Sequence, residues 1–183
     1  AERDPAGWLT AAGEGPGLGA LTQRRLPLDL ILRPEHLVVA REVSGRHTDL
    51  VMVLNHAGKA PVASGWDSPE ARHWATRVAD LARLPKVACK LSGMTTMADL
   101  VTWSVADLRP FVDHLLECFG PDRLLFGSDE PAGRSVCRDR HRRTHPGGRA
   151  LRERATRRPG WHRGEDLSLA PDAVVVSVEP IGA

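Results

Sequence analysis

The sequence predicts an α/β fold in which short parallel strands alternate with helices and close towards a (β/α) barrel. The first observation is residues 50–54, five consecutive apolar residues that lead directly into Asn55 and His56. An unbroken apolar run of this length is typical of a strand that helices bury on both faces. The second observation is that three further apolar runs, between residues 26 and 129, also end in polar residues. Repeated polar strand ends are typical of a barrel with its site at one rim. A doubly wound open sheet remains the alternative.

The amino-terminal third is expected to supply two strands and one helix. Glycine and proline at residues 14–19 predict an interruption of any helix there. Residues 26–33 read as a short strand ending in Arg33. Pro34 suits the first turn of a helix to about residue 44, and Gly45 is expected to end that helix. The strand at 50–55 follows, and its polar end makes His56 the first candidate for chemistry.

A strongly signalled helix is predicted from residue 69 to residue 82. Ser68 is a suitable N-cap and Pro69 suits the first helical position. The apolar residues recur with helical spacing and predict one buried face, which consists of Ala71, Trp74, Ala75, Val78, Leu81 and Ala82. Residues 86–93 follow as a third strand that carries Lys90 and Ser92 near its end.

A second amphipathic helix is predicted after residue 107, followed by the fourth strand. Asp107 is expected to cap this helix, and Pro110 is tolerated in its first turn. Its predicted apolar face consists of Leu108, Phe111, Val112, Leu115, Leu116 and Phe119. Residues 123–129 then form an apolar run that ends in Ser128 and Asp129. The sequence therefore predicts strand, helix and strand in regular alternation up to Asp129.

Composition and length favour one folded domain at residues 1–131 followed by a different kind of segment. The chain has 183 residues, a formal net charge of +2 and 42% hydrophobic residues, which is ordinary for a globular protein. Its 3 cysteines suggest neither a disulfide framework nor a zinc motif and fit a reducing cytoplasm. Residues 132–183 are rich in arginine and poor in aliphatic side chains, so disorder is expected there. A late strand at 173–178 is the exception.

Three short motifs follow one another along the chain: Asn55-His-Ala-Gly-Lys59, Lys90-Leu-Ser-Gly93 and Phe126-Gly-Ser-Asp129. In this order they resemble the amidohydrolase-related family of TIM-barrel hydrolases, particularly its lactonase branch, and the resemblance covers roughly residues 2–131. It implies a partial (β/α)8 TIM barrel that lacks its first strands, because a full barrel needs about 250 residues. The family's opening His-x-His pair does not occur in the sequence, and Glu130 replaces its usual tryptophan. The chain is therefore expected to be an inactive or incomplete member.

The resemblance implies hydrolysis of a lactone or a carboxylated cyclic ester. Asp129 would be the base that activates water, and His56 would polarise the carbonyl or bind metal. His56 and Asp129 would together hold a divalent ion such as Zn or Mn, although some family members are thought to use none. Lys90 and Arg33 are candidates for substrate binding. Against these roles stand ordinary ones: Asp129 as a turn cap, and Lys90 and Arg33 as solvated side chains.

Two expectations about partners follow from the same features. An incomplete barrel exposes strand edges, so instability or self-association is expected. The alternative function is a non-catalytic binding protein whose arginine-rich tail contacts nucleic acid or acidic partners. Nucleic acid is the weaker interpretation, because Trp161 is the sole aromatic residue of that tail and no recognised nucleic-acid module is visible. No apolar run is long enough to predict a membrane span.

Overall fold

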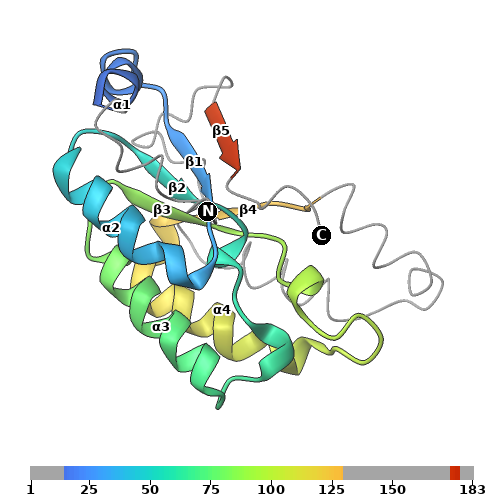
Figure 1. The fold of residues 1–183 in the computed structure, drawn as a ribbon. Coiled ribbons are helices and arrows are strands. Elements are labelled where there is room, and N and C mark those ends of the chain that lie inside the picture. The colour runs from blue at the N-terminus through green and yellow to red at the C-terminus, as the bar shows by residue number, and fades with distance from the viewer. Residues whose placement is uncertain (1–14, 130–173, 178–183) are drawn as a thin grey trace, which may run out of the picture.

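The computed structural model describes residues 15–129 and 174–177, and these form one parallel sheet with a layer of helices on one side (Figure 1). The strands are β1 (Leu28–Ile31), β2 (Met52–Leu54), β3 (Val87–Leu91), β4 (Leu124–Phe126) and β5 (Val174–Ser177). Their order in the sheet is β4-β3-β2-β1-β5, and every pairing is parallel. The helices are α1 (Gly15–Gln23), α2 (Leu37–Arg46), α3 (Pro69–Ala82) and α4 (Val105–Phe119).

The winding of the sheet decides between the two predicted architectures. Strands β1 to β4 lie side by side in chain order, and α2, α3 and α4 all cover the same face (Figure 1). A doubly wound sheet reverses its strand order and places helices on both faces. Consecutive strands with helices outside are the arrangement of a (β/α) barrel. The described residues are therefore a partial TIM barrel, as the sequence predicted.

Alternation along each strand separates the helix-facing side from the inner side of the sheet. Leu28 and Leu30 of β1 pack into the same hydrophobic core as Met52 and Leu54 of β2. Val53 is equally buried but lies outside that core cluster, as expected for a residue that points to the opposite face. Polar residues on that inner face are therefore directed away from the helices and towards the interior of the barrel.

The two predicted amphipathic helices form almost as expected. The Ser68 hydroxyl accepts a hydrogen bond from the backbone N–H of Ala71 at 3.1 Å, and Pro69 is the first residue of α3. Ser104, not Asp107, is the N-cap of α4. Asp107 is the third helical residue, and its carboxylate accepts hydrogen bonds from the backbone N–H and the hydroxyl of Ser104. This is a capping box, in which the acidic residue lies one turn inside the helix.

Two glycine-based predictions were wrong. Residues 15–19 were expected to interrupt a helix, but they begin α1; Pro16 is tolerated in a first turn, and Leu18 is buried in the core. Gly45 was expected to end α2, but the helix continues to Arg46, and His47 caps it with its backbone N–H bonded to the Val43 carbonyl. Tertiary packing outweighed the modest helix cost of glycine at these positions.

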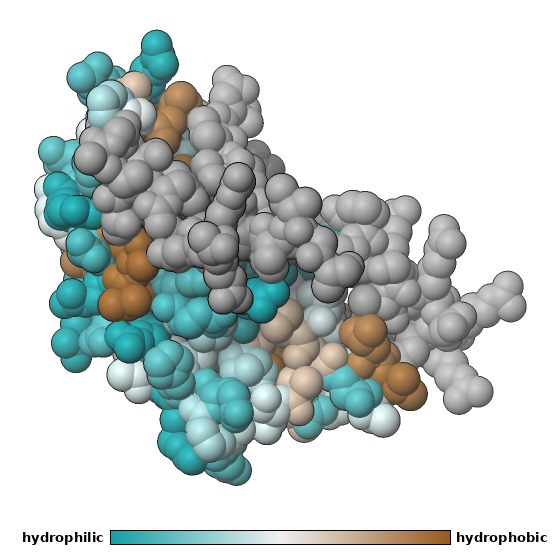
Figure 2. Space-filling view, viewed as in Figure 1, coloured by the Kyte–Doolittle hydropathy of each residue, from teal (hydrophilic) through white to brown (hydrophobic). Residues whose placement is uncertain are grey.

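The arginine-rich segment mostly lies outside the described residues. Its predicted late strand exists as β5, which pairs with β1, and the domain boundary at residue 131 stays a prediction. The surface of the described part is mainly hydrophilic over the outer helices (Figure 2). Its exposed large hydrophobic side chains are Val38, Leu100, Val101 and Phe126. None of the described helices is long and apolar enough to cross a bilayer.

Candidate functional site

The ends of β2, β3 and β4 bring three predicted polar residues together. Nδ1 of His56 lies 3.0 Å from the hydroxyl oxygen of Ser92 and 3.5 Å from Oδ1 of Asp129. The side chains of His56 and Asp129 are only 18% and 17% exposed, so water screens their interaction weakly. The sequence placed these residues at successive strand ends, and the structure confirms that they meet at one edge of the sheet.

Both residues of this pair sit on backbone that L-amino acids rarely adopt. His56 has φ of 50° and Asp129 has φ of 57°. A left-handed conformation at a non-glycine residue costs free energy and persists where the surrounding structure determines it, which is common at functional sites. Strand β2 therefore stops at Leu54 and turns sharply, which directs the imidazole across the end of β3 towards Asp129.

A second polar group lies on the inner face of the sheet. Nζ of Lys90 contacts Oδ2 of Asp29 at 2.5 Å, and Nδ2 of Asn55 donates to the same oxygen at 3.2 Å. Asp29 is almost fully buried, and Oδ1 of Asn55 has no hydrogen-bond partner among the described residues. Lys90, predicted as a solvated or substrate-binding lysine, is thus partly neutralised by a buried carboxylate.

Sequence reasoning did not assign a role to Asp29. The available signal was a carboxylate between Leu28 and Leu30, inside a strand predicted to be buried. A buried charge is normally paired, so a buried aspartate at position 29 predicts a cationic partner. The partner, Lys90, is 61 residues away in sequence, and nothing local identifies it.

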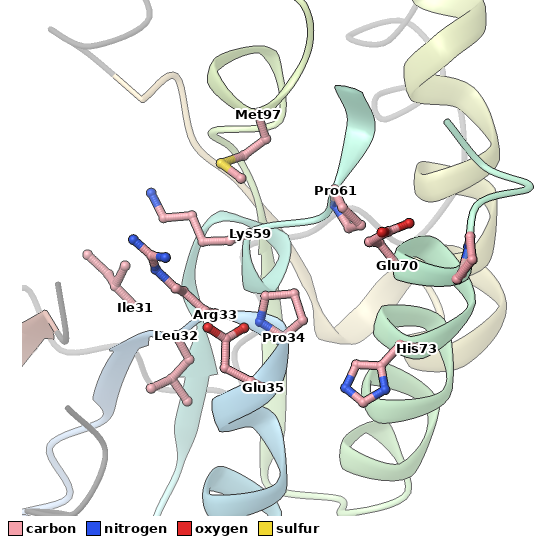
Figure 3. Close-up of a pocket in the computed structure, with 11 residues that line it drawn as sticks. Ile31, Leu32, Arg33, Pro34, Glu35, Lys59, Pro61, Glu70, His73 and Met97 are labelled. Carbon is pink, nitrogen blue, oxygen red and sulfur yellow. The ribbon is translucent and has the colours of Figure 1, made fainter. Parts of the chain in front are cut away.

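Arg33 lies apart from the His56–Asp129 pair and lines a cavity of about 700 Å³ (Figure 3). The cavity's charged lining residues are Arg33, Glu35, Lys59 and Glu70, and His73 contributes an imidazole. In the close-up, the charged ends of Arg33 and Lys59 extend to the same side of the cavity. Neither His56 nor Asp129 lines this cavity, so the structure does not bring the predicted substrate-binding residue Arg33 together with the predicted catalytic pair.

The described residues offer an incomplete set of metal ligands. A catalytic zinc site usually has three protein ligands and one open position. His56 and Asp129 supply two side chains of the right kind, but the described part of the chain contains no cluster of three or more such residues. A third ligand would have to come from outside the described residues.

A thiol nucleophile is not available on β3. Burial, together with the charge of Cys118, raises the pKa of the Cys89 thiol, so this thiol stays protonated. Only the thiolate is a good nucleophile. Cys89 therefore belongs to the packed core and is not a candidate nucleophile.

Comparison with known sequences identifies relatives over most of the chain. The profile of the amidohydrolase family matches residues 2–175, a longer stretch than the motifs at 2–131 indicated. The chain is 33% identical over 131 residues to an L-fucono-1,5-lactonase of Burkholderia ambifaria, covering 69% of this chain and 42% of the relative. It is 34% identical over 138 residues to an L-fucono-1,5-lactonase of Burkholderia multivorans, covering 71% and 46%. The chain thus spans a little under half the length of these curated relatives.

Solved structures show the same fold. A crystal structure of an amidohydrolase from Burkholderia multivorans with bound Zn superposes with a TM-score of 0.69 at 32% identity. That match covers 84% of this chain and 53% of the other chain. A probable 2-pyrone-4,6-dicarboxylic acid hydrolase from Acinetobacter baumannii superposes with a TM-score of 0.58, covering 80% of this chain and 51% of the other. Its 15% identity supports the likeness in fold alone.

Proposed function

The chain belongs to the amidohydrolase family, and from this premise we propose that it hydrolyses the cyclic ester of a small lactone. The observation that carries the proposal is the contact of 3.5 Å between His56 and Asp129 at the carboxyl ends of the strands. Ester hydrolysis needs a base for the attacking water and a positive or hydrogen-bonding group for the carbonyl oxygen. A carboxylate and an imidazole side by side supply these two functions. The lactonase relatives make a sugar-type lactone the first substrate class to test.

Asp129 acts as the base in this proposal. One carboxylate oxygen, Oδ1, faces the imidazole of His56, which leaves Oδ2 to accept a proton from water. The hydroxide equivalent attacks the lactone carbonyl carbon, and the ring C–O bond breaks as the tetrahedral intermediate collapses. The leaving alkoxide takes up the proton, and the product is an open-chain hydroxy acid.

His56 polarises the carbonyl. Contact of Nδ1 with Ser92 and Asp129 orients the ring and favours a proton on Nδ1. In its doubly protonated form, with Asp129 as counter-ion, the imidazole would bring positive charge to the carbonyl oxygen as negative charge develops there. If a divalent ion such as Zn or Mn takes part, His56 and Asp129 are the residues that would hold it, and the ion would supply the same carbonyl polarisation.

Lys90 and Arg33 bind the substrate in different ways. The Lys90 ammonium, already paired with Asp29, suits a hydroxyl or carbonyl oxygen better than a full negative charge. Arg33 is exposed at the cavity and suits a carboxylate at the distal end of a larger substrate. The nearby Glu35 and Glu70 would instead accept hydrogen bonds from hydroxyl groups. These contacts distinguish a neutral sugar lactone from a carboxylated cyclic ester.

The test is lactone turnover by the full chain, followed through the acid released. L-fucono-1,5-lactone and a carboxylated cyclic ester are the two probes. Asp129→Asn is expected to lower kcat by about 10²–10⁴-fold, and His56→Gln by about 10²–10³-fold. The matched control is Asp122→Asn, an exposed aspartate of the short turn before β4, which should retain wild-type turnover. Absence of any lactone turnover in the folded wild type, or full activity of Asp129→Asn, would overturn the proposal.

Two further expectations accompany the proposal. Self-association is proposed on the basis of β4, which pairs on one side only within the described residues. Sedimentation of the purified chain tests it, and a monodisperse monomer would contradict it. A cytoplasmic location is proposed from the cysteine content alone.

A further inference from the structure

The turn that carries His56 has an unusual backbone. All four residues from His56 to Lys59 have positive φ, with values of 50°, 51°, 60° and 53°. Three of them are not glycine, and their Cβ atoms crowd the backbone in this left-handed region. Such a run persists only where surrounding contacts determine it. The contacts that hold this turn therefore also set the direction of the His56 imidazole.

A tryptophan on α3 supplies one of these contacts. Nε1 of Trp74 donates a hydrogen bond of 2.8 Å to the backbone carbonyl of Ala57, the residue directly after His56. Trp74 and Ala57 are both completely buried, so water cannot replace the indole donor if it is lost. Helix α4 holds the indole in place, because the centroid of the Trp74 ring lies 5.4 Å from that of Phe111 and 5.6 Å from that of His114. The helical layer thus reaches through the core to the backbone of the turn.

A glycine after β3 confines the imidazole from the other side. Gly93 has φ of 65°, and a Cβ atom built there would lie 2.7 Å from Nδ1 of His56. The ring therefore packs directly on glycine backbone and cannot move in that direction. The contact with Gly93 and the hydrogen bond from Trp74 to the Ala57 carbonyl together orient the imidazole. Its Nδ1 atom then faces Ser92 and Asp129.

We propose that Trp74 is a positioning residue, whose indole N–H holds the left-handed turn and thereby aims Nδ1 of His56 at Ser92 and Asp129. Without the donor, the Ala57 carbonyl is left buried without a partner and gains by rotating away. Rotation of the Ala57–Gly58 peptide changes ψ of Ala57 and φ of Gly58, which disrupts the left-handed turn and thereby releases the imidazole from its two contacts. Trp74 touches no substrate in this proposal and acts only through the backbone. Its effect on catalysis rests on the proposed function, but its effect on His56 does not.

Trp74→Phe in the full chain tests the proposal, because it keeps an aromatic ring and removes the N–H. The first readout is NMR of the turn. The Lys59 amide, which donates to the His56 carbonyl at 2.9 Å, should exchange about tenfold faster or more. The Nδ1 resonance of His56 should also shift. Trp66→Phe is the matched control, since Trp66 packs on the same Phe111 and His114 rings and should leave the turn unchanged.

The second readout is turnover. Trp74→Phe should lower kcat for the lactone by about tenfold or more, because a small misplacement of a catalytic group is costly, and should change KM by less than about twofold. If the wild type turns over no lactone, the proposed function fails while the NMR result still decides the positioning role. Should Trp74→Phe fail to fold, 3-benzothienylalanine at position 74 removes only the donor. Unchanged Lys59 exchange and an unchanged His56 resonance in a folded variant would overturn the proposal.

Discussion

Replacing Lys90 by methionine removes the ammonium beside Asp29 and keeps most of the side-chain volume. The two charged atoms lie 2.5 Å apart, and the side chains of Asp29 and Lys90 are 6% and 27% exposed. At an effective dielectric constant near 20 this separation corresponds to ~7 kcal/mol of attraction. Desolvation of the buried carboxylate opposes most of that attraction. The net effect of the pair on stability is therefore much smaller than the Coulomb energy.

The loss of one partner is expected to be more damaging than the loss of both. Removing one member of a buried pair costs about 3–5 kcal/mol. The exposed fraction of Lys90 and the remaining bond from Asn55 place Lys90→Met near the lower end, at about 3 kcal/mol. Asp29→Leu should cost about 3 kcal/mol: the Lys90 ammonium can turn towards water, but the buried amide of Asn55 loses its acceptor. The double variant leaves no unpaired charge, so its main cost is the lost acceptor of Asn55, about 2 kcal/mol.

Urea unfolding of the four proteins at neutral pH, followed by circular dichroism, measures this cycle. The expected coupling free energy is about 4 kcal/mol, far above the ~0.5 kcal/mol that independent sites show. Equal m-values across the four proteins are the control that the unfolded states are comparable. Additive costs of the two single variants, or a cost below about 1 kcal/mol for Lys90→Met, would refute the interpretation that Asp29 is a buried carboxylate that needs Lys90.

Three other predictions concern α4, the core and the site. The backbone N–H and hydroxyl of Ser104 hold the pKa of Asp107 below its ordinary value. The stability that these hydrogen bonds give is fully present above the unfolded-state pKa and is lost as pH falls through the folded-state pKa. The Tm advantage of wild type over Asp107→Asn should therefore shrink as pH falls below about 4. Burial raises the pKa of the Cys89 thiol. Iodoacetamide should therefore leave Cys89 unmodified in the native protein and modify it in urea, which peptide mapping measures. Equal rates of labelling in the native and the unfolded protein would contradict the burial of Cys89. Gly127→Ala places a Cβ 3.1 Å from Cβ of Ser92 and should destabilise the chain by about 1–3 kcal/mol in urea unfolding, whereas unchanged stability would mean that Ser92 moves freely.

The helices show which local signals were sufficient to predict structure. The bounds of α3 follow from Ser68 and Pro69, because a capping hydroxyl and a proline both favour a helix start and disfavour its interior. Glycine was a weaker guide. Its cost in a helix is only about 1 kcal/mol, and burial of Leu18 offsets that cost in α1. A residue that merely weakens a helix cannot fix its end when packing acts on the same turn.

The meeting of His56 and Asp129 was predictable, since parallel strands in register bring their carboxyl ends to one edge. The turn that aims His56 was not, because Asn55-His-Ala-Gly-Lys59 contains a single glycine yet has four consecutive left-handed residues. The reason lies in tertiary contacts with Trp74 and Gly93, which are far from the turn in sequence. Local propensity disfavours this backbone, and conflict between local preference and global structure is expected at functional sites.

The pairing of Asp29 with Lys90 follows from sheet register and from nothing local. Asp29 is registered with Val53 on β2, and Val53 with Ala88 on β3. Lys90 is two residues beyond Ala88, so it shares the inner face and lies one step nearer the carboxyl rim. Its long side chain then reaches back across β2 to the carboxylate. Because this contact depends on the register of two strand pairs, a single strand's sequence cannot specify it.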